Sequence, residues 1–130
     1  MDKKEDVSEF EKLEQQLHSF LDEMSELSRK KPDGPVNKFK LQFINSAIKA
    51  LNRLLGDHRP FKDFGTFDVD DLPTNSDVVL ILAQYAAATY NLRREQTEKG
   101  GYGAEWYWIV RGRVSDLETK APESSKYRPK

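Results

Sequence analysis

Apolar side chains recur at steps of three and four residues along three stretches of the chain, which is the spacing of amphipathic helices. Residues 7–31 contain neither proline nor glycine, and their apolar positions follow a heptad pattern. The positions of this heptad seam are Phe10, Leu13, Leu17, Phe20, Met24 and Leu27. We therefore predict one long helix here, with Ser8 as its cap. Because the seam is narrow, it suits packing against one or two other helices, either within the chain or in a partner.

The second apolar stretch predicts a central core helix. Residues 30–36 contain two prolines and a glycine, and they end the first helix. Asn37 follows as the expected N-terminal cap, and Gly56 is the expected end after Leu55. The apolar positions between them are Leu41, Phe43, Ile44, Ala47, Ile48, Ala50, Leu51, Leu54 and Leu55. A face this broad is typical of a buried helix.

A third helix is expected over residues 75–98. Thr74 or Ser76 is its expected cap, and Asp77 lies in the first turn, where a negative charge suits the helix dipole. Residues 78–88 are apolar almost all round, which implies contacts on several sides of this helix.

Two segments lack a clear helical period. In residues 57–74, Phe67 and Val69 alternate with charged residues, which predicts an ordered loop anchored by aromatics with a short strand. Residues 106–110 favour a strand because they are aromatic and β-branched. Residues 105–118 also fit a fourth helix, against which Gly112 counts by about 1 kcal/mol. Both alternatives stay open at this point.

These elements predict a mainly α-helical fold. We expect a bundle of three principal helices, the first long and heptad-patterned, with a short C-terminal aromatic strand or fourth helix. Residues 1–6 are expected to form a flexible N-terminus and residues 7–118 a single helical domain. Residues 119–130 have too little apolar surface to offset the entropy of ordering, so we expect a disordered tail.

Composition narrows the possible classes of protein. Only 37% of the 130 residues are hydrophobic and 33% are charged, so the apolar side chains must gather on particular faces to form a core. The absence of cysteine excludes disulfides, thiolate zinc sites and thiol nucleophiles. The N-terminus lacks an apolar signal region, and no stretch reaches the roughly 20 apolar residues of a membrane span. We expect a cytoplasmic protein with no membrane partner.

The net charge of −1 conceals a strong segregation of charge along the chain. Residues 1–28 carry −6, residues 29–62 carry +7, residues 63–77 carry −5 and residues 78–130 carry +3. Segments of opposite sign can attract each other within the fold or between molecules, and the positive segment can also attract a polyanion.

Few residues suggest enzymatic chemistry. Asp68, Asp70 and Asp71 offer three carboxylates on one loop, but they lack the spacing of a known calcium loop. Residues 57–59 place an acid, an imidazole and a guanidinium side by side, although side chains at adjacent positions diverge. We expect no cofactor and name no catalytic residue. A small metal-dependent enzyme is the last alternative.

Two groups of residues suggest a nucleic-acid-binding regulator. One face of the second helix presents basic and amide side chains that suit phosphates and bases, and the C-terminal segment combines aromatics with arginines. The residues are Lys38, Gln42, Asn45, Lys49 and Arg53 on the helix, and Trp106, Trp108, Arg111 and Arg113 in the segment.

The function that the sequence favours is non-enzymatic association with a protein partner or with a second copy. An amphipathic heptad helix and segregated charges are features that helix-mediated assembly uses. The expected interface is the heptad seam defined above, and a homo-oligomer is the expected product.

Overall fold

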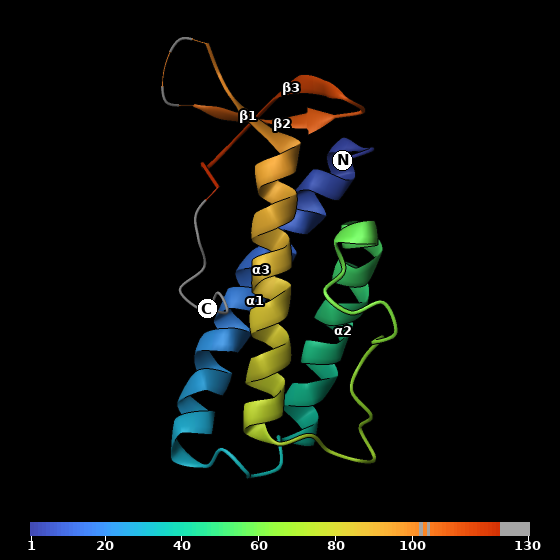
Figure 1. Cartoon of the computed structure of the whole chain (residues 1–130), viewed down its shortest axis with the longest axis vertical. Coiled ribbons are helices and arrows are strands. Elements are labelled where there is room, and N and C mark those ends of the chain that lie inside the picture. Colours follow the sequence, from blue (N-terminus) through green and yellow to red (C-terminus); the bar gives the residue numbers. More distant parts are fainter. Residues whose placement is uncertain (102, 104, 123–130) are drawn as a thin grey trace.

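A computed structural model of the chain describes residues 1–101, 103 and 105–122 (Figure 1). Within these residues, the fold is mainly helical with three long helices, as predicted. A small antiparallel sheet follows them, where we expected a single strand or a fourth helix. The helices are α1 (Lys4–Lys30), α2 (Lys38–Leu55) and α3 (Asn75–Gln96), and one short 3-10 turn, η1 (Gly56–His58), follows α2. The strands are β1 (Thr97–Lys99), β2 (Trp106–Val110) and β3 (Arg113–Thr119).

Helix α1 begins earlier than predicted. Its N-cap is Lys3, which gives no side-chain cap, so the expected cap at Ser8 is wrong. Acidic side chains in the first turn favour this earlier start because they face the positive end of the helix dipole. Residues 1–6, expected to be flexible, make defined contacts with the far end of the chain. The Met1 ammonium donates hydrogen bonds to Gln96 Oε1 (2.7 Å) and to the carbonyl oxygen of Ile109 (3.3 Å).

The other two helices begin at the predicted caps. The Asn37 side chain accepts a hydrogen bond from the backbone N–H of Lys40 at 3.1 Å, and Gly56 ends α2 with a positive φ of 52°. Thr74, rather than Ser76, caps α3. Its hydroxyl accepts from the backbone N–H of Asp77 at 3.1 Å, and the Asp77 carboxylate accepts from the Thr74 N–H at 3.3 Å. This reciprocal pair is a capping box.

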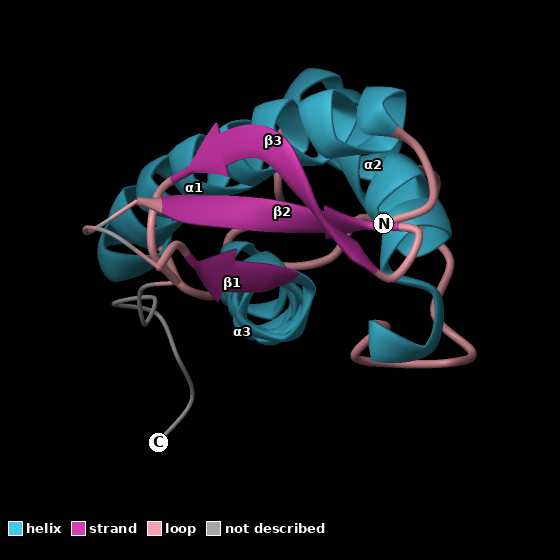
Figure 2. Ribbon diagram, turned by 90° about the horizontal axis from the view of Figure 1, so that it is seen from above, coloured by secondary structure: helices cyan, strands magenta, loops and turns pink. Residues whose placement is uncertain are grey.

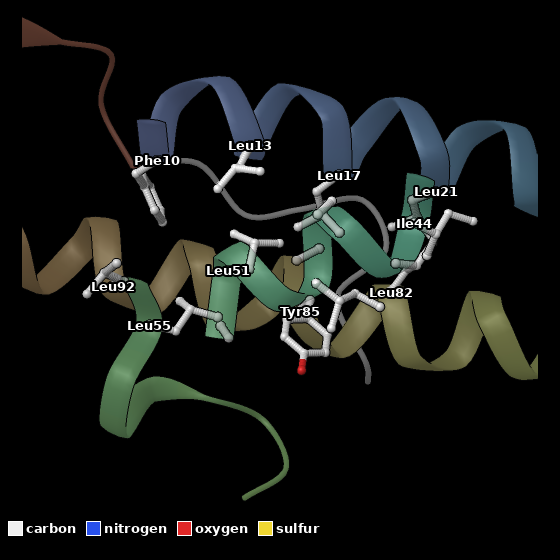
Figure 3. Close-up of a cluster of buried hydrophobic side chains, with 14 of the residues drawn as sticks. Phe10, Leu13, Leu17, Leu21, Ile44, Leu51, Leu55, Leu82, Tyr85 and Leu92 are labelled. Atoms are coloured by element: carbon white, nitrogen blue, oxygen red, sulfur yellow. The ribbon is translucent and has the colours of Figure 1, made fainter. Parts of the chain in front are cut away.

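The three helices share one hydrophobic core. Figure 3 shows Phe10, Leu13 and Leu17 reaching from α1 toward side chains of α2 and α3. On α2, the predicted line of apolar positions is buried, whereas Phe43, which we had placed on the same face, is largely exposed. The helical period therefore predicted the centre of the buried face of α2 correctly, but it wrongly extended that face to Phe43.

The C-terminal segment forms strands, which settles the alternative left open for residues 105–118. Strand β2 lies between β1 and β3 and pairs antiparallel with both, across the ends of the helices (Figure 2). Arg111 and Gly112 link β2 to β3, and both have positive φ, 53° and 74°. Two such residues form the type I′ turn that suits a tight hairpin. The predicted end of α3 near residue 98 is wrong, because Thr97 begins β1.

The loop between α2 and α3 contains no regular strand, so the short strand expected around Phe67 and Val69 is absent from these described residues. The loop is nevertheless anchored on the core, as predicted. Asn45 of α2 both donates to the carbonyl oxygen and accepts from the N–H of Phe67, each at 2.9 Å. The Asn52 amide donates to the carbonyl oxygen of Gly65 at 3.0 Å.

Candidate functional site

The heptad seam of α1 is mostly an internal surface. Phe10, Leu13, Leu17 and Met24 are buried within the chain, and Phe20 and Leu27 are partly buried at the edge of the core. Phe10, Leu13 and Leu17 are therefore not accessible to a partner in this fold, Met24 is only 1% exposed, and our expectation that the whole seam forms an interface needs correction. The physical reason is that α2 and α3 already cover most of this narrow stripe.

One apolar groove remains open where the C-terminal half of α1 meets the N-terminal half of α2, at the end of the molecule opposite the sheet (Figure 1). Its volume is about 210 Å³. Its lining residues are Phe20, Glu23, Met24, Phe39, Lys40, Phe43 and Ile44. No residue of α3 lines it. Two seam positions, Phe20 and Met24, thus contribute one wall of this α1–α2 groove.

Two aromatic rings stand out from the α2 wall of the groove. Phe39 is 68% exposed and Phe43 is 53% exposed. They are four residues apart, which places them one above the other on a helix, and their rings meet edge to face with centroids 5.0 Å apart. Exposed apolar patches that are rimmed by polar residues often mark an interaction site.

The rim of the groove carries one charge of each sign. Lys40 Nζ on α2 lies 3.2 Å from Glu23 Oε1 on α1, and both side chains are partly exposed. This ion pair bridges the two walls at the surface. The groove therefore combines an apolar floor and a rim without net charge.

Sequence analysis missed Phe39 and misassigned Phe43. Phe39 and Phe43 share a helix face at a spacing of four, and this spacing was visible in the sequence. What the sequence did not show was that α3 packs on the other side of the α1–α2 pair and leaves that part of the face uncovered. Sequence analysis assigns Phe43 to the core because it shares a helical spacing with Ala47, Ala50 and Leu54, which widen the apolar face of this helix.

The basic face of α2 is largely neutralised within the chain. Arg53 contacts Glu9 (Nη2–Oε2, 2.6 Å) and Asp6 (Nη1–Oδ1, 3.4 Å). Lys38 Nζ lies 3.8 Å from Asp70 Oδ1. Oppositely charged segments thus attract each other inside the fold, and these contacts compete with any polyanion for the same cations.

The amide and aromatic groups proposed for nucleic acid are also engaged elsewhere. Asn45 holds the loop at Phe67, as described above. Trp108 is fully buried and packs edge to face on Phe10, with ring centroids 5.5 Å apart, so it cannot stack on a base. Arg111 donates through Nε to the carbonyl oxygen of Asp2 at 2.9 Å.

The remaining nucleic-acid candidates lie apart. Gln42 and Lys49 are exposed on α2, Arg113 is exposed on β3, and Trp106 is partly buried on β2. The structure therefore does not gather the nine residues into one surface, and this leaves nucleic-acid binding without a specific structural observation in its favour.

The acidic loop does not form a metal cage in this structure. The described part of the chain has no group of three or more His, Cys, Asp or Glu side chains arranged to hold a metal ion. Asp68 instead accepts a hydrogen bond from the backbone N–H of Asp70 at 2.9 Å, and Asp70 pairs with Lys38. Two of the three carboxylates that sequence analysis considered, Asp68 and Asp70, thus make a contact within the loop and a contact from the loop to α2.

Residues 57–59 do not form a catalytic group. His58 Nε2 lies 3.1 Å from Glu95 Oε2 on α3, whereas Arg59 donates through Nη2 to the carbonyl oxygen of Phe64 at 2.8 Å. The imidazole and the guanidinium therefore serve different contacts, as expected for adjacent side chains.

No helix in the part of the chain that the structure describes combines the length and the apolar character of a membrane span. Comparisons of the chain with protein-family models, with curated proteins and with solved structures give no match. A functional proposal must therefore come from the residues and their geometry.

Proposed function

We propose that this chain is a non-enzymatic protein–protein association module, a three-helix bundle whose contact surface is the α1–α2 groove. The heptad helix still takes part, because it supplies Phe20, Met24 and Glu23 to the groove. The observation that carries the proposal is the pair of exposed aromatic rings, Phe39 and Phe43, beside an apolar hollow.

The size of the groove favours a protein side chain over a small metabolite. Pockets for small ligands usually have volumes of roughly 300–1,000 Å³, whereas this groove has about 210 Å³. Its lining is mostly apolar, with Glu23 and Lys40 joined to each other at the rim. A hollow of this kind fits an aromatic anchor, and aromatic residues are prominent among those that dominate binding energy at protein interfaces.

Charge supports the same assignment. The acidic N-terminal segment and the basic segment after it pair with each other through Arg53, Asp6 and Glu9. This part of the segregated charge therefore acts within the fold, and Lys40 and Glu23 pair at the rim of the groove. What the groove itself offers to a partner is mainly apolar surface, and burying it removes that surface from water.

Site-specific photocrosslinking in cells tests the proposal. A benzophenone side chain is placed at Phe39, and at Leu80 as the matched control, since Leu80 is 59% exposed but lies on α3 outside the groove. We expect protein adducts from position 39, reduced by Phe43→Glu in the same chain, and few from position 80. Equal adduct yields at the two positions, or adducts that a nuclease removes, would refute the proposal.

A further inference from the structure

We infer that the occupant of the α1–α2 groove is a second copy of this chain, related to the first by a twofold axis parallel to α1 and α2. This inference rests on the proposed function and specifies its partner. Three features of the groove carry it: its shape, its rim charges and its apolar area.

The surface supplies both halves of a self-complementary contact. The α1–α2 groove is the hollow, and Phe39, which stands largely exposed at its edge, is the projection. In a twofold interface the same patch is used by both partners, so each copy must present a projection and a hollow together. Phe39 of each copy can then enter the groove of the other, where Phe20 and Met24 of α1 form the facing wall.

The rim charges fix the direction of the axis. Lys40 and Glu23 lie on opposite walls at the same height, because their charged atoms are 3.2 Å apart. A twofold axis parallel to the helices places α1 of each copy over α2 of the other. Glu23 of each copy then faces Lys40 of the other. A twofold axis that lies in the interface plane but runs perpendicular to the helices would instead set α1 against α1 and α2 against α2, so that Glu23 faces Glu23 and Lys40 faces Lys40. The parallel axis therefore gives attraction at both ends of the contact.

The four helices at such an interface form a familiar arrangement. Within one chain α1 and α2 run in opposite directions, as the colours in Figure 1 show. The parallel axis keeps these directions, so each α1 also runs antiparallel to the α2 that it faces in the partner. Two α1–α2 pairs, stacked face to face, thereby make an antiparallel four-helix bundle in which side chains of the two pairs can interdigitate.

The exposed area predicts a weak dimer. The exposed parts of Phe39 and Phe43 together present on the order of 200 Å² per copy. A stable interface buries about 800 Å² per partner, so the rings can form its centre but not its whole extent. The nearly neutral chain, with a net charge of −1, adds little long-range repulsion between copies. We expect half-dissociation at roughly 10–100 µM.

Sedimentation of the purified full chain over roughly 1–500 µM tests self-association. The weight-average mass of the natural chain should rise from 15.0 kDa toward twice that value. Phe39→Glu should weaken dimerisation at least about tenfold, while the control Leu80→Glu should change it less than about twofold. Circular dichroism spectra of both variants serve as the control that their helix content is unchanged. A natural chain that stays monomeric throughout, or equal effects of the two variants, would overturn the inference.

Charge reversal tests the pairing at the rim without touching the aromatic rings. The single variants test the axis, because a perpendicular axis sets residue 40 against residue 40 and residue 23 against residue 23, so that a reversal would only replace one like pair by another. Lys40→Glu and Glu23→Lys should each weaken dimerisation, because each places like charges opposite one another in the homodimer. An equimolar mixture of the two variants should recover a dimer, since every Glu then faces a Lys. Failure of the mixture to dimerise more strongly than either variant alone would contradict the twofold pairing.

The two proposals fail in different ways. A monomeric natural chain combined with position-39 crosslinks to a different protein would refute the second copy and leave the association module in place. The absence of position-specific crosslinks would refute the association module itself.

Discussion

Arg93 and Glu14 form a buried ion pair whose disruption should cost a large fraction of the stability of the fold. The guanidinium Nη2 lies 2.7 Å from Glu14 Oε1 and Nε lies 3.2 Å from Oε2, with side chains only 2% and 7% exposed. Arg93 Nη1 also donates to Thr119 Oγ1 at 2.6 Å and to the carbonyl oxygen of Lys120 at 3.1 Å. One side chain of α3 thus holds α1 and the end of β3.

Replacing Arg93 by Met removes the cation and leaves the Glu14 carboxylate buried. Breaking a buried pair in this way costs about 3–5 kcal/mol. Lys120 Nζ, 3.9 Å from Glu14 Oε1, remains as a partly exposed cation, so we expect a loss near the lower end of that range. A loss of about 3 kcal/mol is a large fraction of the 5–15 kcal/mol that stabilises a typical domain. It should lower the melting temperature by roughly 10 °C.

Urea unfolding followed by tryptophan fluorescence measures this loss. Trp108 is fully buried, and the Arg93 guanidinium lies 4.9 Å from the centroid of its ring, so its emission reports on this region. Asp116→Asn is the control, because the ion pair of Asp116 with Lys4 is largely exposed and should matter little.

The double variant Arg93→Met, Glu14→Leu distinguishes a charge effect from a packing effect. It removes both charges and should recover most of the stability lost by Arg93→Met alone, because no unpaired charge stays buried. If Arg93→Met shifts the urea midpoint no more than Asp116→Asn does, the reasoning from burial is wrong.

Three further predictions concern the loop, a buried phenol and the hairpin. Asn45→Ala removes both hydrogen bonds to the Phe67 backbone, which should cost about 1–3 kcal/mol and speed amide exchange at Phe67; the exposed Gln42→Ala is the control, and unchanged exchange would contradict the anchoring role. Burial raises the pKa of the Tyr85 hydroxyl above 10.0, so the folded state binds this proton up to a higher pH than the unfolded state does, and the free energy of unfolding should fall as pH rises above about 10. In urea unfolding at a series of pH values, the free energy of Tyr85→Phe should fall less steeply with pH; an equally steep fall in both proteins would contradict the burial argument. Gly112→Val forces a β-branched side chain to a φ of +74°, which should cost at least about 1 kcal/mol in urea unfolding; a neutral effect would mean that the turn differs from type I′.

Sequence reasoning succeeded where local chemistry determines structure. Asn37 and Thr74 cap their helices because a short polar side chain can reach the free N–H groups of the first turn, whatever the rest of the fold does. Gly56 ends α2 for an equally local reason, since a positive φ suits a residue without a side chain. These three boundaries needed no knowledge of tertiary contacts.

The sheet was harder to predict because its outer strands carry little signal. Strand β1 is only Thr97–Lys99, and β3 mixes charged residues with few β-branched ones. Their strand conformation depends on pairing with β2, a contact between segments that sequence periodicity does not report. Gly112 did contain a signal, but we weighed its cost in a helix and overlooked its value beside Arg111 in a tight turn.

The heptad seam shows a more general limit. A spacing of three and four residues says which side of a helix is buried, but intramolecular and intermolecular packing produce the same spacing. Here α3 packs along α1 more extensively than α2 does. Which part of the seam is buried therefore depends on α3, a helix that is distant from α1 in the sequence. The candidate site could be recognised only after the structure showed which part of the seam remained uncovered.

That uncovered part has a geometric cause. Two antiparallel helices leave a groove on each side of their line of contact, and a single third helix can cover one of them. In this chain α3 covers one side with a packed core, while no residue of α3 lines the α1–α2 groove on the other. Phe39 and Phe43 lie on that open side, where water would normally favour polar residues. A further helical element is what such a surface accommodates, and in the dimer that we infer, the α1–α2 pair of the second copy would supply one of complementary direction and charge.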